Sequence, residues 1–370
     1  MKISYFSIAL AGLLSTLAVD AFDLRKDTGG LAVYWGQNSL SLQTDGAVEE
    51  GELEEYCNAS SPPDVILLSF HHVFTNNPQI NLSKHCDKYF KNSQMLDCTS
   101  LETQIQACQQ KGIKILLSMG GATGSYSFRS ESVGVDYAQT VYDLFLNGNS
   151  TDAELPRPFG SAVLDGVDLD IEGGGSTGYA EFTNKLHEIS SDILITAAPQ
   201  CAFPDAMLGE ALDNGWIDAV FIQFYNNFCN AGTENFNFNE WAEWAKSTSK
   251  NPDVKLYIGS PACEKCASTG YLGADELGKI YQDTESKYAD VLGGIMLWDA
   301  GAAYHSDDGS EAIAVQLKQS VLKSSASNDN SEPAVSSNVK RAASSIRSIV
   351  GRDAHQAKHP NYQTGDPYGG

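Results

Sequence analysis

Eight short apolar runs recur along the chain, and they limit its fold more than any other feature. Each run has the length of one buried β-strand and is followed by a loop and a segment of helical periodicity. The runs are GLAVYWG (30–36), DVILLSF (64–70), IKILLSMGG (113–121), LDGVDLDIE (164–172), DILITAAPQ (192–200), DAVFIQFY (218–225), VKLYIGSPA (254–262) and LGGIMLWDA (292–300).

Two of the intervening segments show the helical pattern well, because their apolar residues fall on one face: Leu101, Ile105 and Cys108 in the first, and Tyr179, Phe182, Leu186 and Ile189 in the second. Apolar strands that alternate with helices indicate a parallel sheet covered by helices. Eight such units predict an α/β fold, a closed (β/α)8 TIM barrel over residues 22–323. An open doubly wound sheet is the alternative, but no G-x-G-x-x-G follows the first run.

The two ends of the chain differ in composition from the region between them. The N-terminus, MKISYFSIALAGLLSTLAVDAF, has one basic residue, an apolar stretch, and then Val19 and Ala21 before a cleavage point. This pattern predicts a secretory signal peptide over residues 1–21 rather than a membrane anchor, because the apolar stretch is short. Residues 324–370 are rich in Ser, Asn, Gly and Pro, so we expect a low-complexity, disordered tail.

Charge and cysteine content narrow the partners and the compartment. The chain has 370 residues and a net charge of −23, which argues against nucleic acid and anionic membranes as partners. Eight cysteines suggest disulfides in a secreted protein. Sequons at Asn58, Asn81 and Asn149 are compatible with surface glycosylation. We therefore expect a monomer that is secreted, in the extracellular space or a cell wall.

The fourth run, LDGVDLDIE, places carboxylates inside an apolar strand. Alternate side chains of a strand share a face, so Asp168, Asp170 and Glu172 point the same way and step toward its C-terminal end. Asp165 is out of phase with them. The C-terminal ends of the strands carry the active site of a parallel barrel. We therefore expect Glu172 at the mouth, Asp170 below it and Asp168 deeper.

Adjacent carboxylates in a partly buried place cannot all ionise cheaply. They are expected to share protons, and at least one pKa should rise. A raised pKa at Glu172 is what a general acid needs near neutral pH. The alternatives are a divalent-cation site and a solvated acidic strand. We favour the acid, with no metal or cofactor, because the spacing is not that of a calcium-binding loop and the neighbouring residues are apolar.

The pattern D-x-x-D-x-D-x-E and five further motifs resemble the family 18 glycoside hydrolases, and among them the class III chitinases of plants and fungi. The motifs are YWGQN (34–38), LLSMGG (116–121), LDGVDLDIEGG (164–174), AAPQC (197–201), FIQFYNN (221–227) and GGIMLWDA (293–300). The resemblance covers residues 30–322. It implies a TIM barrel that hydrolyses β-1,4-linked N-acetylglucosamine inside chitin or its oligosaccharides.

The resemblance also implies a mechanism in which the substrate takes part. Most glycosidases use two carboxylates, but in this family the N-acetyl oxygen of the substrate attacks the anomeric carbon and forms an oxazolinium ion, with net retention. By the motif, Glu172 protonates the leaving oxygen and later activates water. Asp170 accepts a hydrogen bond from the acetamido N–H, and Asp168 shares a proton with Asp170. Tyr225 donates a hydrogen bond to the acetamido carbonyl.

Six more residues are candidates for the wall of the substrate groove. Trp298 ends the eighth run and is a candidate floor for the sugar, since an indole stacks well on an apolar sugar face. Tyr34 and Phe70 end the first two runs, where groove lining and core packing are equally compatible with the sequence. The six candidates are Gln223, Asn226, Trp298, Tyr34, Phe70 and Gly121, the last because glycine permits close backbone approach.

Histidines and cysteines leave some questions open. His71 and His72 follow the second run. The alternatives for them are that they bind a metal, that they sense pH, or that they are solvated or fill a polar slot, and this last alternative is the usual case. The resemblance implies the disulfides Cys57–Cys108, Cys86–Cys98 and Cys201–Cys229. Cys263 and Cys266 lie outside that pattern, and pairing between them is a guess.

Three functions are compatible with these residues. The first is an endo-acting chitinase, and the second is an endo-β-N-acetylglucosaminidase that cuts the core of N-glycans with the same chemistry. The third is a chitin-binding lectin or inhibitor on the same barrel with an inactive site. The complete set of Asp168, Asp170, Glu172 and Tyr225 argues against the third. The full set of chitinase motifs favours the first.

Overall fold

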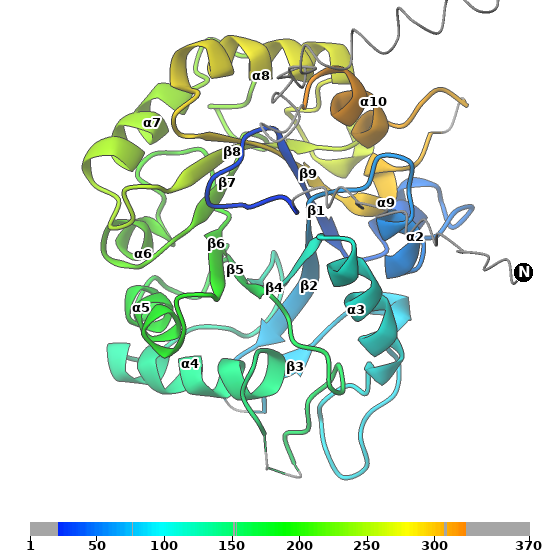
Figure 1. Cartoon of the computed structure of the whole chain (residues 1–370), viewed down its shortest axis with the longest axis vertical. Coiled ribbons are helices and arrows are strands. Elements are labelled where there is room, and N and C mark those ends of the chain that lie inside the picture. Colours follow the sequence, from blue (N-terminus) through cyan, green and yellow to red (C-terminus); the bar gives the residue numbers. More distant parts are fainter. Residues whose placement is uncertain (1–20, 76, 151, 153, 307–308, 323–370) are drawn as a thin grey trace, which may run out of the picture. The chain divides into compact units, whose positions relative to one another are not determined.

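The computed structural model describes residues 21–322 except 76, 151, 153 and 307–308. Within these residues eight parallel strands close into a barrel, so the TIM-barrel prediction is confirmed (Figure 1). The barrel strands are β1 (Gly30–Trp35), β2 (Val65–Val73), β4 (Lys114–Gly120), β5 (Gly166–Asp170), β6 (Leu194–Ala197), β7 (Ala219–Gln223), β8 (Lys255–Pro261) and β9 (Leu292–Trp298). The predicted signal peptide and tail lie almost entirely outside the described residues.

The order of the strands in the sheet is β1-β9-β8-β7-β6-β5-β4-β2, and the pairing of β1 with β2 closes the circle. All eight pairings around the barrel are parallel. A ninth strand, β3 (Gln79–Ile80), pairs antiparallel with the end of β2 outside the barrel. Because the strands are parallel, all eight C-terminal ends meet at one face, where the loops that follow them can share a site.

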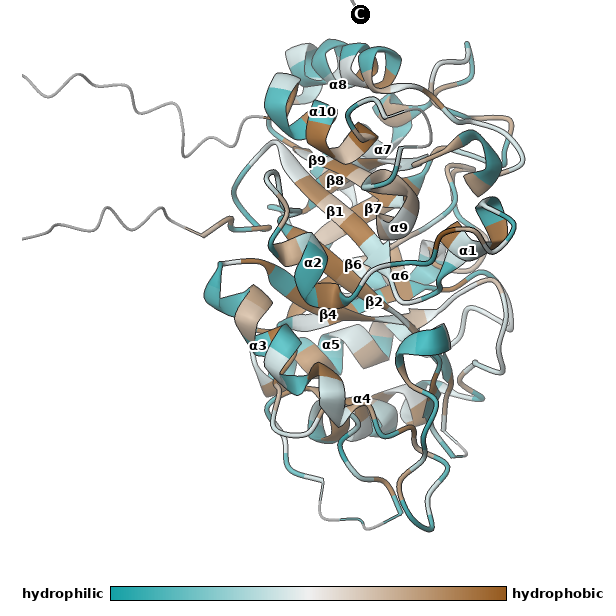
Figure 2. Ribbon diagram, turned by 90° about the vertical axis from the view of Figure 1, so that its right-hand side faces the viewer, coloured by the Kyte–Doolittle hydropathy of each residue, from teal (hydrophilic) through white to brown (hydrophobic). Residues whose placement is uncertain are grey.

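Helices form an outer ring around the strands (Figure 1). The predicted amphipathic faces are confirmed, since Ile105 and Cys108 are fully buried, as are Phe182 and Leu186. Figure 2 shows apolar strands in the interior and polar outer faces on the helices. The helices are α1 (Ser39–Gln43), α2 (Leu53–Cys57), α3 (Glu102–Gln110), α4 (Glu131–Phe145), α5 (Tyr179–Ile189), α6 (Gly209–Asn214), α7 (Phe238–Ser247), α8 (Ala274–Tyr288), α9 (Ala300–Ala303) and α10 (Ile313–Ser320), with short 3-10 turns η1 (Ser83–His85), η2 (Thr99–Leu101) and η3 (Glu264–Cys266).

The interior of the barrel is a packed core, not a pore. Its cluster includes Ala32, Leu67, Leu116 and Tyr257, each from a different strand and each completely buried. Leu24, from the segment that precedes β1, belongs to the same cluster, so this segment helps to close the end of the barrel where the strands begin. Alternate residues of the strands face outward and form a second cluster with the helices.

All four disulfides join residues within the barrel unit. The three pairs implied by the resemblance, Cys57–Cys108, Cys86–Cys98 and Cys201–Cys229, are confirmed, and Cys263 pairs with Cys266. Cys201–Cys229 joins the loops that follow β6 and β7. Among the described residues, no helix is long and apolar enough to cross a membrane.

Candidate active site

A cavity of about 210 Å3 opens where the barrel strands end. Its wall comes from the ends of β1, β2, β5, β7 and β9 and from the loops that follow β4 and β8. It therefore collects side chains that are far apart in sequence. The lining residues are Tyr34, Gln37, Phe70, Ala122, Thr123, Asp170, Glu172, Gln223, Tyr225, Asn226, Cys266 and Trp298.

The carboxylates of β5 step outward from the barrel core to this cavity. Asp168 is completely buried, Asp170 is 3% exposed, and Glu172 is exposed. The strand itself ends at Asp170, so Glu172 stands two residues beyond it, on the loop rather than in the strand. Asp170 and Glu172 line the cavity and Asp168 does not. The depth order expected from the alternating pattern is the one that the structure has.

Asp168 lies inside the barrel among hydroxyl groups. Thr196 Oγ1, Ser118 Oγ and Tyr34 Oη donate hydrogen bonds to its oxygens at 2.7, 2.8 and 3.0 Å. Burial raises the pKa of Asp168 to about 6, and the three hydrogen bonds partly oppose that rise. Ser118 and Thr196 come from the neighbouring strands β4 and β6, and Tyr34 comes from β1 across the barrel. None of these donors is Asp170, so a proton shared between Asp168 and Asp170 stays a prediction.

Asp170 is held at the base of the cavity by an amide. Gln223 Nε2 donates to Asp170 Oδ1 at 2.9 Å and to the carbonyl oxygen of Ala198 at 3.0 Å. Burial, followed by the negative charges of Glu172 and Asp168, raises the pKa of Asp170 well above its ordinary value. Desolvation in the cavity also raises the pKa of Glu172. A carboxyl group that keeps its proton at this position is suited to donate it to a bound substrate.

Tyr126, which the sequence analysis missed, fixes the backbone of Glu172. Its hydroxyl accepts a hydrogen bond from Glu172 N at 3.2 Å and donates one to the carbonyl oxygen of Gly121. Gly121 N in turn donates to Asp170 O at 2.8 Å. Tyr126 lies in the loop after β4, and no spacing in the sequence connects it with Glu172. Only the closed barrel brings the two loops together.

Gly121 does not line the cavity, although it was predicted to lie close to it. Its φ is +89°, and a Cβ atom there would lie 2.8 Å from the ring of Phe70. Glycine is required because this backbone must turn in the left-handed region against an aromatic ring. The residue therefore acts through Phe70, which does line the cavity.

Tyr225 and Asn226 follow β7 and have different surroundings. Tyr225 is 8% exposed, and burial together with the charges of Asp170 and Glu172 raises the pKa of its phenol well above the ordinary value. It therefore remains a hydrogen-bond donor. Asn226 Oδ1 accepts hydrogen bonds from Ser268 N at 2.8 Å and Thr269 N at 3.2 Å. Asn226 thus lines the cavity and also holds the loop that follows β8.

Three aromatic rings form one side of the cavity. The ring of Trp298 lies 5.9 Å from that of Phe70 with an interplanar angle of 18°, and 5.4 Å from that of Tyr34. Tyr34 and Phe70 are buried and also line the cavity. Both therefore pack in the core and line the groove at the same time. Gln37 also lines it. The motif YWGQN contained Gln37, but the sequence analysis gave it no role.

Of the roles considered for His71, the structure shows a buried ring whose two nitrogens both have polar partners, so it fills a polar slot. It is completely buried; its Nδ1 lies 2.8 Å from Gln79 O and its Nε2 lies 2.6 Å from Tyr137 Oη. Burial lowers the pKa of His71 to about 3, so the ring is neutral, and burial also lowers the pKa of His72. Within the described part of the chain no three His, Cys, Asp or Glu side chains gather as a metal site would require.

Comparisons with known proteins show which family the chain resembles. Residues 30–287 match the sequence profile of "Glycosyl hydrolases family 18". Chitinase 2 of Rhizopus oligosporus is 44% identical over 307 residues, which are 82% of this chain and 55% of that protein. The chain spans about half the length of the first curated relatives that it matches.

Solved structures of a chitinase and of an inhibitor protein resemble the barrel equally well. The ICChI chitinase from Ipomoea carnea has a TM-score of 0.64 and 30% identity, over 78% of this chain and 99% of that one. The xylanase and alpha-amylase inhibitor protein XAIP-II from Scadoxus multiflorus has a TM-score of 0.64 and 31% identity, over 78% and 97%. The fold alone thus does not decide the activity, but the profile match and the Rhizopus relative show that this chain belongs to family 18 of the glycosyl hydrolases.

Proposed function

We propose that this protein is a secreted endo-acting chitinase that hydrolyses β-1,4-linked N-acetylglucosamine with retention of configuration. The observation that carries the proposal is the row of carboxylates on β5, which ends in Glu172 at the mouth of a cavity lined by Trp298. The names of the relatives, including Chitinase 2 of Rhizopus oligosporus, support the substrate class. Secretion is supported by the N-terminal pattern of residues 1–21 and by the disulfides.

In the proposed first step, a sugar lies over Trp298, and its N-acetyl carbonyl oxygen attacks the anomeric carbon of the same sugar. The bond to the leaving sugar breaks, and Glu172 transfers its proton to the leaving oxygen. Asp170 accepts a hydrogen bond from the acetamido N–H and offsets the positive charge of the oxazolinium ion. Tyr225 donates to the acetamido oxygen, which holds it for attack. In a preorganised site, each such dipole contributes a few kcal/mol to stabilising the transition state.

In the second step Glu172, now a carboxylate, takes a proton from water. The oxygen of that water attacks the anomeric carbon from the face that the leaving sugar vacated, and the oxazolinium ring opens. Two displacements on one carbon give net retention, and Glu172 ends protonated as it began. Glu172 must start protonated, so activity should fall at high pH. Asp170 must carry its negative charge, so activity should also fall at low pH. We therefore expect a bell-shaped pH dependence with an acidic optimum.

The decisive experiment compares the wild type with Glu172→Gln on chitin oligosaccharides, with product anomers resolved at early times. We expect β-anomers from the wild type and a loss of about 10²-fold or more in kcat for the variant. Glu264→Gln is the matched control, because Glu264 is exposed on η3 and does not line the cavity. α-Anomers, or full activity in Glu172→Gln, would contradict the mechanism.

The two other functions give distinct results in the same assay. Binding of chitin oligosaccharides without cleavage by the wild type would indicate a lectin or inhibitor on this barrel, as the structural likeness to XAIP-II allows. Release of glycans from an N-glycosylated protein, with no cleavage of chitin, would indicate an endo-β-N-acetylglucosaminidase.

A further inference from the structure

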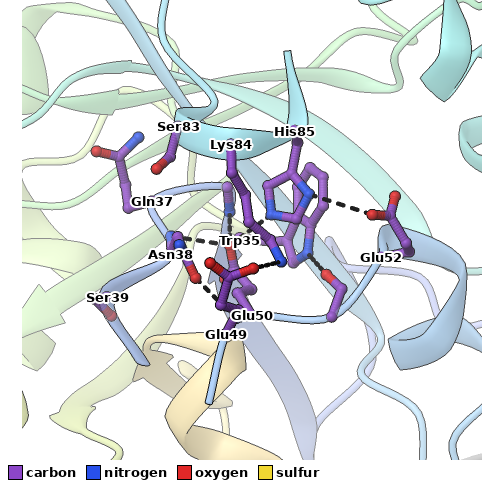
Figure 3. A network of polar contacts seen from close by, with 12 residues as sticks. Trp35, Gln37, Asn38, Ser39, Glu49, Glu50, Glu52, Ser83, Lys84 and His85 are labelled. Atoms are coloured by element: carbon purple, nitrogen blue, oxygen red, sulfur yellow. Dashed lines mark hydrogen bonds and ion pairs between the residues drawn. The ribbon is translucent and has the colours of Figure 1, made fainter. Parts of the chain in front are cut away.

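A buried carboxylate holds the loop of residues 36–39, which follows β1 (Figure 3). Glu50 is 1% exposed, and its Oε2 accepts hydrogen bonds from Gly36 N and Asn38 N, each at 3.0 Å. A reciprocal hydrogen bond joins the same two residues, because the Oδ1 atom of Asn38 accepts from Glu50 N at 2.8 Å. The two segments therefore fix each other, although neither lies in a sheet at this point.

The conformation of the loop explains why it needs such an acceptor. Gly36 has φ +118°, and a Cβ atom there would lie 2.9 Å from Ser69 O; Asn38 has φ 52°, in the left-handed region. These turns take the N–H groups of the loop away from any strand partner. A buried N–H without an acceptor is costly, and a carboxylate is a stronger acceptor than an amide oxygen.

A histidine completes the coordination of Glu50. His85 Nε2, from η1, lies 3.1 Å from Glu50 Oε2, and the side chain of His85 is fully buried. Its ring packs on Trp35, the last residue of β1, with the ring centroids 4.2 Å apart (Figure 3). On the solvent side, Lys84 Nζ pairs with Glu49 Oε2 at 2.6 Å. Glu50 thus connects β1, its loop and η1.

A second buried carboxylate, Asp299, lies on the other side of the same loop. Ser39 Oγ donates a hydrogen bond to Asp299 Oδ2, and Asp299 Oδ1 caps α9 by accepting from Ala302 N at 3.2 Å. Burial, followed by the negative charge of Glu50, raises the pKa of Asp299 to about 7. Asp299 therefore gains its negative charge as the pH rises through about 7.

Two residues of the candidate active site are adjacent in the chain to this arrangement. Gln37 is the second residue of the loop, and its Nε2 donates to Ser69 O at 2.6 Å and to Asn81 O at 3.0 Å. Trp298 directly precedes Asp299. Both Gln37 and Trp298 line the cavity, whereas Glu50 and Asp299 do not.

We propose that Glu50 is a positioning residue for saccharide binding, which fixes Gln37 through the loop and Trp298 through Asp299. This inference rests on the proposed function, since it assumes that the cavity receives a chito-oligosaccharide. Glu50 does not contact the substrate. Its effect is to hold Gln37 and Trp298 in one geometry before the sugar binds. Binding then requires less loss of side-chain conformational entropy.

The first test is the affinity for chitotetraose, measured by calorimetry in a Glu172→Gln background so that hydrolysis does not consume the ligand. We expect Glu50→Gln to weaken binding about tenfold at pH 5, because a neutral amide is a poorer acceptor for two N–H groups and His85. Glu49→Gln is the matched control, an adjacent exposed carboxylate, and should bind as the background does. In the active enzyme the same change should raise KM more than it lowers kcat.

The second test is pH dependence, which a merely structural role would not produce. Besides Asp299, the titratable groups around Glu50 are His85, Glu52 with Oε1 3.9 Å from His85 Nδ1, and Tyr56. We expect the affinity for chitotetraose to fall as the pH rises through about 7, where Asp299 gains its charge beside Glu50. Asp299→Asn should abolish this step, and Glu50→Gln should move it to lower pH.

The outcomes separate this inference from the proposed function. If the wild type binds chitotetraose without cleaving it and Glu50→Gln weakens the binding, the proposed activity fails and the positioning role stands. If Glu50→Gln folds and binds as tightly as Glu49→Gln, the positioning role is overturned. If Glu50→Gln does not fold, the Asp299→Asn variant decides, and a pH step that persists in it overturns the role. No binding of chitotetraose by any variant overturns both proposals.

Discussion

The two ends of the barrel treat buried carboxylates in opposite ways. Where the strands begin, Asp218 is 1% exposed and pairs with Arg25, whose Nε lies 2.9 Å from Asp218 Oδ1. Ile195 N also donates to Asp218 at 2.9 Å. Where the strands end, the hydrogen bonds to Asp168 and Asp170 come from hydroxyls and an amide, and their pKa values rise.

The difference shows what each end contributes. A buried carboxylate that pairs with a cation and accepts a hydrogen bond from a backbone N–H joins the chain segments that supply these groups. A buried carboxylate without a cation has a raised pKa, as Asp168 and Asp170 do, and such shifts are common at functional sites. The buried carboxylate at the N-terminal end of this barrel therefore serves stability, and in the proposed function the carboxylates at the C-terminal end serve reactivity.

The largest expected effect of breaking this contrast is on catalysis. In the proposed mechanism Asp170→Asn removes the charge that offsets the oxazolinium ion, so we expect kcat on chitin oligosaccharides to fall about 10²- to 10³-fold. The thermal midpoint should stay the same or rise, because the variant removes a buried carboxylate that has no cation. Steady-state kinetics and calorimetry on one preparation check both. A large loss of stability in Asp170→Asn would show that this carboxylate stabilises the fold, as Asp218 does at the other end of the barrel, and would contradict the comparison.

The second effect is on the pH dependence of stability. The pKa of Asp168 is about 6 in the folded chain against about 4 when unfolded, so the folded state binds its proton more tightly. This contribution, about 3 kcal/mol, is present below pH 4 and is lost as the pH rises through 6. Urea titrations should show the free energy of unfolding falling less steeply from pH 4 to 6 in Asp168→Asn than in the wild type.

That comparison needs a control because His71 acts in the opposite direction. The pKa of His71 is lowered to about 3, so its contribution is present above about pH 6.5 and is lost as the pH falls. The His71 contribution is the same in the wild type and in Asp168→Asn, so it cancels in the difference between their curves. That difference reports Asp168 together with its charge effect on the pKa of Asp170. Equal slopes in the two proteins would refute the assignment.

The third effect is on stability at the other end. In Asp218→Asn an amide NH2 group replaces one of the two carboxylate oxygens, which accept hydrogen bonds from Arg25 and from a neighbouring backbone N–H. The new NH2 group, itself a donor, then faces one of these donors. We expect a loss of about 2 kcal/mol in the free energy of unfolding, below the cost for a fully buried pair because Arg25 is 30% exposed. Activity per folded molecule should be unchanged. A fall in kcat at constant stability would contradict the division between the ends.

The smallest effect concerns Lys318 on α10. Its Nζ lies 2.6 Å from Asp64 Oδ2, which also accepts from Leu31 N at 2.8 Å, and both side chains of the ion pair are partly exposed. Lys318→Met should cost about 1 kcal/mol at low ionic strength, and less in 1 M salt because the pair is screened. Chemical denaturation at two salt concentrations measures this. A loss that salt does not reduce would mean that packing of α10, not charge, carries it.

The sequence by itself determined the barrel and the acidic row. Apolar runs of strand length that alternate with amphipathic helices fit few folds, and the period of two in Asp168, Asp170 and Glu172 places all three on one face. These are local patterns, set by backbone geometry over a few residues. Trp298 was also found from the end of its strand, because the C-terminal ends of a parallel barrel converge, whereas Gln223 and Tyr225 came from the resemblance to family 18.

Only the tertiary structure decided what surrounds those residues. Tyr126 reaches Glu172 across two loops, Gly121 acts through Phe70, and Glu50 holds the loop that presents Gln37. These contacts join segments whose separation in the sequence has no period, so no local pattern reports them. The rise in the pKa values of the acidic row likewise depends on closure of the barrel, because desolvation comes from neighbours that only the packed fold supplies.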